Sequence, residues 1–316
     1  MRVAAIQMEP TLGAVEENCA AAERLVLEAV DGGAGLIVLP EFFTSGAAFH
    51  PSLLDASRPI DGAPFQLLCR LAKERDVIVG GSFIAEHGER VFNTFVLAFP
   101  DGSTHFHDKD LPTMWETCYY EPGNDDGVLE TSAGVIGVAM CWELIRTQTV
   151  RRLENNIGFA IGGSCWWDVP YGSNSAELEA ARAQNVALYE KTPATFARLL
   201  RVPFVHAAHT GDFEGMTPGA EGLPYRSRWL GRAQIVDGHG TVLASATQEE
   251  GEAVVIADIN PGEVDEDKIE LPDAFWLHDL PKAALDAWDS QNAFGRQYYD
   301  EITRPHRRQR LNRQGR

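Results

Sequence analysis

Short apolar runs alternate with helical segments over the first 260 residues, and this alternation limits the possible folds more than any other feature. Strands are predicted at residues 3–7, 35–41, 77–86, 134–140, 157–164 and 203–210, and helices at 14–34, 63–76, 146–156 and 175–200. Further strands are predicted in a hairpin over 91–109, with its turn at Asp101-Gly102, and within 230–258. Strands separated by helices, with no linker between the halves, indicate one α/β domain.

The alternation fades from about residue 260, where the sequence becomes mixed. Residues 304–316 contain six arginines and no acidic residue, although the whole chain has a net charge of −19. We therefore expect a domain over residues 1–260, followed by an extension over 261–316. The basic tail of this extension is expected to be disordered or to contact a neighbouring subunit.

Charge and cysteine content exclude several classes of protein. A net charge of −19 argues against binding to nucleic acid or to an anionic membrane surface. No segment approaches the ~20 apolar residues of a membrane span, and the N-terminal apolar run is too short for a signal peptide. The five cysteines are widely spaced and contain no CxxC, so neither a disulfide framework nor a zinc ribbon is indicated. These features predict a cytoplasmic protein.

Three chemically active side chains each follow a predicted strand: Glu41, Lys109 and Cys141. A lone cysteine is typically a core residue, but the carboxyl ends of strands in α/β sheets are where ligands bind. A cysteine attacks as its thiolate, which requires a base or a nearby cation. Glu41 could accept the thiol proton, and Lys109 with the backbone N–H of Trp142 could stabilise an oxyanion. The three residues together therefore indicate nucleophilic catalysis by Cys141.

The segments around these residues resemble the nitrilase superfamily of carbon–nitrogen hydrolases, which uses a Glu–Lys–Cys triad. The matching motifs are "LIVLPEFF" around Glu41, "HDKDLPTMWE" around Lys109 and "GVAMCWE" around Cys141, within a resemblance over residues 2–260. The resemblance implies a four-layer αββα sandwich that assembles as a homodimer or larger homo-oligomer, with no metal or organic cofactor. It also implies a second catalytic glutamate at Glu116, although Glu121 lies nearby.

The implied reaction is attack by Cys141 on a small-molecule nitrile or amide, release of ammonia or an amine, and hydrolysis of a thioester. The Cys-Trp-Glu triplet ending at Glu143 is similar to nitrilases rather than to the amidase branches. The segment "LIRTQTVRRL" that follows it matches neither branch, so nitrile, amide and N-carbamoyl substrates stay open. The rival interpretation is a non-catalytic or metal-binding protein on the same scaffold. Its candidate ligands are the pairs His105 with His107 and His206 with His209, but no carboxylate motif accompanies them.

Aromatic residues adjoin the proposed site in the sequence: Phe42, Trp115, Trp142, Trp166 and Trp167. Aromatic walls favour flat or apolar groups and exclude water, which strengthens electrostatic interactions. We therefore expect these residues to bind a small neutral or cationic substrate with an apolar or aromatic part, rather than a dicarboxylate. The alternative is that these rings belong to the core.

Overall fold

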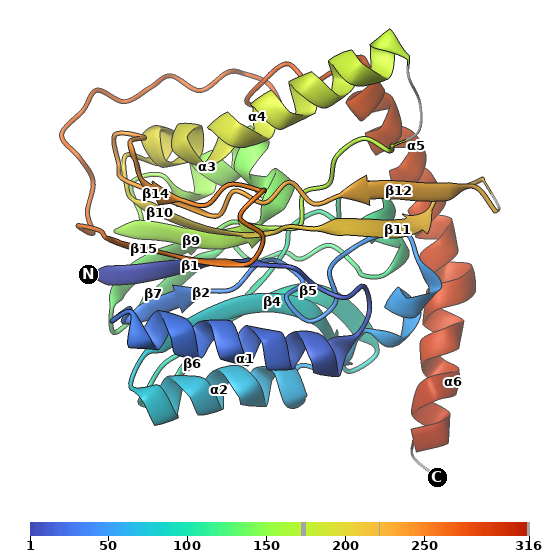
Figure 1. Cartoon of the computed structure of the whole chain (residues 1–316), viewed down its shortest axis with the longest axis horizontal. Helices are drawn as coiled ribbons and strands as arrows, with labels where there is room; N and C mark the ends of the chain where they lie inside the picture. The colour runs from blue at the N-terminus through green and yellow to red at the C-terminus, as the bar shows by residue number, and fades with distance from the viewer. Residues whose placement is uncertain (172–174, 221, 315–316) are drawn as a thin grey trace.

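The computed structural model describes residues 1–171, 175–220 and 222–314 as a four-layer α/β sandwich. Helices α1 (Val15–Asp31) and α2 (Ala63–Arg75) cover one side of the strands, and α3 (Thr147–Leu153) and α4 (Ala176–Leu200) cover the opposite side (Figure 1). This arrangement confirms the expected αββα architecture.

Each inner layer is a mixed sheet. The first contains β6 (Thr104–Asp108), β5 (Arg90–Ala98), β4 (Ile78–His87), β2 (Leu36–Val38), β1 (Arg2–Met8) and β15 (Ala253–Asp258), with the short β3 (Arg58–Pro59) beside β4. The second contains β7 (Val128–Thr131), β8 (Gly134–Val138), β9 (Phe159–Ser164), β10 (Phe204–His209), β13 (Gln234–Val236) and β14 (Val242–Ser245). Parallel pairing of β1 with β10, at Gln7–Ala208 and Met8–His209, joins the two sheets.

The alternation of side chains along each strand explains the layers. In β1, Val3 and Ala5 pack against the second sheet, whereas Ala4, Ile6 and Met8 pack against α1 and α2. In the second sheet, Ala160 and Phe204 pack against α3 and α4. Both faces of these central strands are buried, which accounts for their continuous apolar sequences.

Other elements connect the layers or extend from them. Short 3₁₀ helices η1 (Pro51–Asp55), η2 (Met114–Cys118) and η3 (Cys141–Ile145) follow strands or loops, and β11 (Asp212–Met216) pairs with β12 (Pro224–Arg228) in a hairpin. None of the helices in the described residues combines the length and the apolar character needed to span a lipid bilayer.

The C-terminal region differs from the sequence analysis, which assigned it no helix. Helix α5 (Lys282–Tyr298), the π-helical turn η4 (Tyr299–Thr303) and α6 (Arg304–Gln314) run continuously along one end of the sheets (Figure 1). In α6, Arg310 forms an ion pair with the buried Glu86, and Arg307 donates hydrogen bonds to the carbonyls of Gly88 and Glu89. Residues 304–314 of the basic tail therefore form a helix that contacts its own chain, and the expected contact with a neighbouring subunit stays a prediction.

Candidate active site

Glu41 follows β2 and carries a carboxylate held from several directions. Its Oε1 accepts hydrogen bonds from Lys109 Nζ (2.8 Å) and Asn93 Nδ2 (2.9 Å). Its Oε2 accepts a hydrogen bond from the backbone N–H of Cys165 (3.0 Å) at the end of β9. Burial raises the pKa of Glu41 to about 7, against the lowering effect of the Lys109 ammonium. The carboxylate is thus oriented and able to exchange a proton near neutral pH.

Lys109 lies between two buried carboxylates. It follows β6, its backbone N–H donates to the Asn93 carbonyl (2.9 Å), and its Nζ also donates to Glu116 Oε2 (2.7 Å). Burial lowers the pKa of the ammonium, but the charges of Glu116 and Glu41 raise it by more, so Lys109 stays charged. A fixed cation at this point can stabilise negative charge that develops on a bound substrate.

Glu116 is fixed by the first turn of η2. Its Oε2 accepts hydrogen bonds from the backbone N–H of Thr113 (2.8 Å) and from the hydroxyl of Tyr120. Its Oε1 is buried and has no hydrogen-bond partner among the described residues, so it can accept one from a substrate or a water molecule. Glu121, the nearby alternative in the sequence, lies elsewhere and contacts Arg90 and Tyr299.

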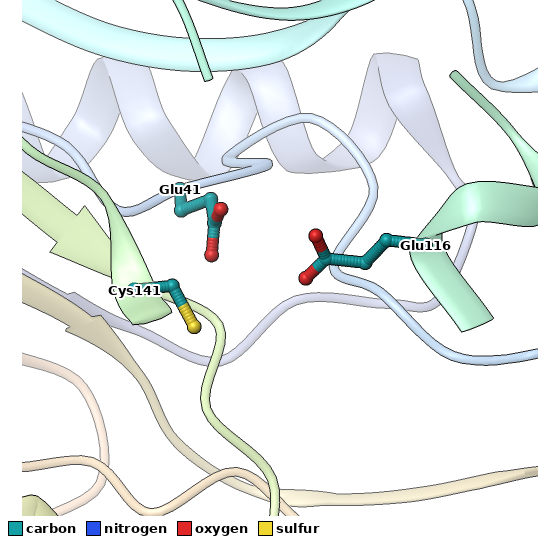
Figure 2. A group of neighbouring side chains, drawn as sticks. All are labelled: Glu41, Glu116 and Cys141. Carbon is teal, nitrogen blue, oxygen red and sulfur yellow. The ribbon is translucent and has the colours of Figure 1, made fainter. Parts of the chain in front are cut away.

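Cys141 is the first residue of η3, three positions after the last residue of β8, and its side chain is fully buried. Its φ of +50° is a left-handed conformation that costs a non-glycine residue about 1–3 kcal/mol, and such strain concentrates at functional sites. Burial and the Glu41 charge raise the pKa of the thiol, so it needs a base to become a nucleophile. The thiol and the carboxylates of Glu41 and Glu116 point toward one another (Figure 2). The Cys141 sulfur and one carboxylate oxygen from each glutamate lie within 4.8 Å of one another.

The model of the carbon–nitrogen hydrolase family matches residues 2–269. The chain belongs to this family. It is therefore a carbon–nitrogen hydrolase, and the resemblance stated from its motifs is confirmed.

Individual proteins are similar to this hydrolase to different extents. It is 31% identical to mouse (Mus musculus) omega-amidase over 45% of the chain, a match that spans 55% of that protein. It is 25% identical to a nitrilase from Pyrococcus abyssi over 82% of the chain and 90% of that protein. The crystal structure of a family protein from Xanthomonas campestris, with an arsenic adduct in its active site, has a TM-score of 0.64 at 18% identity. That match covers 82% of this chain and 90% of the other, and it supports the fold.

Four of the aromatic residues expected at the site, Trp115, Trp142, Trp166 and Trp167, line a cavity of about 230 Å³. The fifth, Phe42, does not line this cavity. Its ring packs against Tyr120, and Lys109 Nζ lies 6.0 Å from the ring centroid. Phe42 thus lies beside the Lys109 ammonium rather than in the cavity wall.

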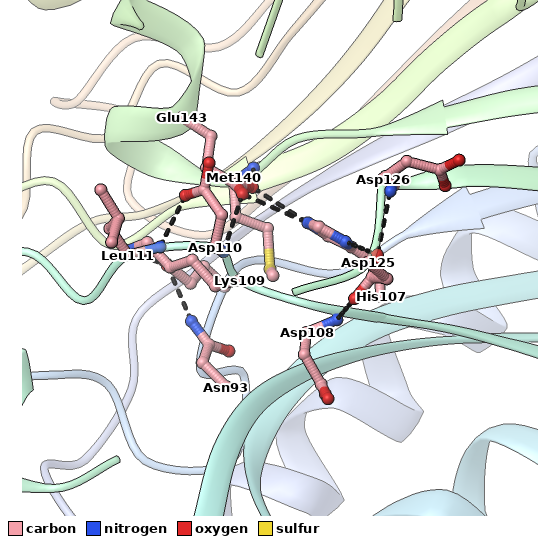
Figure 3. Close-up of polar contacts among 12 residues, drawn as sticks. Asn93, His107, Asp108, Lys109, Asp110, Leu111, Asp125, Asp126, Met140 and Glu143 are labelled. Atoms are coloured by element: carbon pink, nitrogen blue, oxygen red, sulfur yellow. Dashed lines mark hydrogen bonds and ion pairs between the residues drawn. The ribbon is translucent and has the colours of Figure 1, made fainter. Parts of the chain in front are cut away.

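A buried ionic network in this hydrolase was missed by the sequence analysis, which treated Glu143 only as a marker of the branch. Glu143 accepts hydrogen bonds from the backbone N–H groups of Met140 (2.8 Å) and Asp110 (3.0 Å), and from Arg152 (2.9 Å) and His107. Figure 3 shows how these contacts connect the turn before Cys141 with the loop after Lys109. The only signal in the sequence was a charged residue two positions after the cysteine.

The histidines considered as metal ligands have other contacts. His107 lies between Asp125 and Glu143, and although burial lowers its pKa, these carboxylates raise it to about 10. His206 contacts the Ser164 hydroxyl (2.8 Å), and His209 Nε2 contacts the Glu41 carbonyl (2.8 Å). Burial lowers the pKa of both, to about 3 and about 4, so both rings are neutral. His107, His206 and His209 therefore make separate sets of contacts.

We expect kcat/KM for amide hydrolysis to fall as pH decreases through about 7, where Glu41 takes up a proton. The sign follows from the role assigned to the carboxylate, because only its ionised form can accept the thiol proton. Initial rates with acetamide, whose charge does not change in this range, measure the effect. Circular dichroism at each pH is the control for unfolding, and a flat profile through neutral pH would contradict the role of Glu41 as base.

Proposed function

We propose that this protein hydrolyses small primary carboxamides to carboxylic acids and ammonia, with Cys141 as the nucleophile. The observation that carries the proposal is the geometry of the site. The Cys141 sulfur and one carboxylate oxygen each from Glu41 and Glu116 lie within 4.8 Å of one another, and the Lys109 ammonium lies between the two carboxylates. An omega-amidase is among the similar proteins. Nitrile hydrolysis is the second candidate, supported by the Cys-Trp-Glu triplet at residues 141–143 and by the similarity to a nitrilase.

In the first half-reaction, Glu41 takes the thiol proton as the sulfur of Cys141 forms a bond to the amide carbon. Negative charge develops on the carbonyl oxygen, and Lys109 together with the backbone N–H of Trp142 stabilises it. The carbon–nitrogen bond then breaks as Glu41 gives its proton to the nitrogen. Ammonia leaves, and the acyl group stays on Cys141 as a thioester.

In the second half-reaction, Glu41 removes a proton from a water molecule, and the oxygen of this water attacks the thioester carbon. The carbon–sulfur bond breaks, the proton returns to the sulfur, and the carboxylic acid leaves. Glu116 keeps Lys109 charged and in place through its Oε2. Its unpartnered Oε1 accepts a hydrogen bond from the substrate amide or from the attacking water.

A substrate panel tests this function by ammonia release. We expect ammonia from acetamide and phenylacetamide at rates well above those from acetonitrile, phenylacetonitrile and an N-carbamoyl amine. Cys141→Ala protein prepared in parallel controls for contaminating amidases. Turnover of the nitriles alone would favour the second candidate, and turnover of the N-carbamoyl compound alone would favour a carbamoyl hydrolase. No ammonia from any compound would contradict the proposal.

We also propose that the protein assembles as a homodimer or larger homo-oligomer. This assembly is supported by the family resemblance and by the exposed Arg308 and Arg313 of α6, which can contact a second acidic chain. Light scattering against the chain mass of 34.7 kDa measures the assembly. The cytoplasm is the proposed compartment, supported by five cysteines that all have free thiols in the described structure.

A further inference from the structure

Helix α5 forms one wall of the cavity beside the active site. Ala284, Ala287 and Gln291 of α5 and Leu280 before it line the cavity together with the four tryptophans named above. This wall lies beyond residue 269, where the match to the family model ends. At about 230 Å³ the cavity exceeds the roughly 150 Å³ that holds a benzene molecule in a protein core. A ring with a short side arm therefore fits.

The charge of the cavity wall favours a neutral occupant. The described residues that line it include no lysine, arginine or histidine. Its one carboxylate, Asp168, is fully buried and forms ion pairs with Arg228 (3.2 Å) and Arg182 (3.5 Å). A carboxylate on the bound group would lose its hydration without gaining a partner, which is unfavourable.

Two buried polar atoms of wall residues have no hydrogen-bond partner in the described structure: Trp115 Nε1 and Gln291 Oε1. Buried donors and acceptors are nearly always satisfied in native proteins. Trp115 is 1% exposed, and its ring stacks on Trp167 at 4.0 Å between centroids. An uncharged polar substituent on a bound group would supply the missing partner.

The cavity adjoins the nucleophile through shared side chains. Met114, Trp142 and Trp166 line the cavity and pack in one cluster with Cys141, which itself does not line it. Trp288 of α5 stacks on Trp142 with centroids 5.6 Å apart and planes within 7°. To reach Cys141, the reacting carbon of a substrate bound in the cavity must pass these side chains. The unbranched Met114 changes rotamer more easily than the tryptophans.

We propose that the cavity binds the acyl group of the substrate, that this group is neutral and aromatic or branched apolar, and that Ala284 and Ala287 of α5 set its largest size. This inference rests on the proposed amide hydrolysis and adds the substrate class. The small side chains of these alanines leave the space that a ring would occupy. Larger side chains at these positions would fill that space.

The test replaces Ala284 with phenylalanine and compares acetamide with phenylacetamide. We expect Ala284→Phe to lower kcat/KM for phenylacetamide by at least about tenfold, mainly through KM, because the new ring occupies the acyl site. The value for acetamide should stay within about twofold, since a methyl group does not need the cavity. Ala293→Phe on the exposed side of the same helix is the matched control and should leave both values unchanged.

Several outcomes would overturn the inference. Equal losses on both amides, the same effect from Ala293→Phe, or faster wild-type turnover of the anionic succinamate than of phenylacetamide would each contradict it. If Ala284→Phe does not fold, Ala284→Val provides a smaller obstruction. Calorimetry of phenylacetamide binding to Cys141→Ala, with and without Ala284→Phe, tests the cavity without turnover. Amide binding that Ala284→Phe weakens, in a protein that hydrolyses no amide, would contradict the proposed function and leave the cavity assignment standing.

Discussion

Ammonia release from every amide substrate is expected to disappear when Cys141 is replaced with alanine. In the proposed mechanism the thiol forms the covalent bond to substrate, and removing the nucleophile of a catalytic triad costs on the order of 10⁶-fold in rate. The fold should persist, because alanine keeps the Cβ and meets the same constraint at φ +50° that cysteine already meets. The measurement is kcat from initial rates, with circular dichroism to check the fold.

Cys165→Ala is the control for that variant. Cys165 is equally buried and adjoins Glu41, but it contacts this carboxylate through its backbone N–H, which alanine retains. We expect the control to keep its rate within about tenfold. Substantial activity in Cys141→Ala, or an equal loss in Cys165→Ala, would show that Cys141 is not the nucleophile.

Replacement of Lys109 with methionine should reduce both stability and activity. Methionine has a similar length but no charge, so the buried carboxylates of Glu41 and Glu116 would lose their shared cation. Breaking a buried ion pair by removing one partner typically destabilises a protein by about 3–5 kcal/mol. The rate should fall by about 10²–10³-fold or more, since a donor to the developing oxyanion is also lost. Urea unfolding measures the first effect, and initial rates measure the second.

The double variant Lys109→Met with Glu116→Gln separates the two effects. The glutamine removes one buried negative charge, so stability should partly recover, whereas activity should not. Recovery of activity would mean that Lys109 only neutralises Glu116. If Lys109→Met alone unfolds at the same urea concentration as the wild type, this result would contradict the stabilising role of the buried ion pairs.

Much of the layered fold and the meeting of the three charged or nucleophilic residues follow from local sequence patterns. The apolar run of β2 ends at Pro40, and that of β8 ends at Cys141, so the positions of Glu41 and Cys141 after strands can be read from the chain. In the structure, β2, β1, β10, β9 and β8 pair in parallel in that order, and this pairing directs the carboxyl ends of β2 and β8 to one rim.

Contacts between distant segments could not be predicted in this way. Asn93 and the backbone N–H of Cys165 reach Glu41 only after the sheets assemble, and no local pattern reports such contacts. Helix α5 had a helical signal, since Leu280, Ala284, Ala287, Trp288 and Gln291 follow helical spacing. Two of these residues are alanines, which give little hydrophobic contrast, and the apolar face was therefore not recognised.

The position of α5 in the chain also bears on how such an enzyme can diversify. Its side chains border the space next to Trp142, yet Glu41, Lys109, Glu116 and Cys141 all lie within the segment matched by the family model. The residues proposed for the chemistry and one part of the wall proposed to discriminate between substrates are thus encoded in separate stretches of one gene. If the proposed acyl site is correct, changes at Ala284 or Ala287 would alter the acyl group that the enzyme accepts while leaving in place the Trp288 ring that stacks on Trp142, and a library of variants at these two positions of Lys282–Tyr298 would test this.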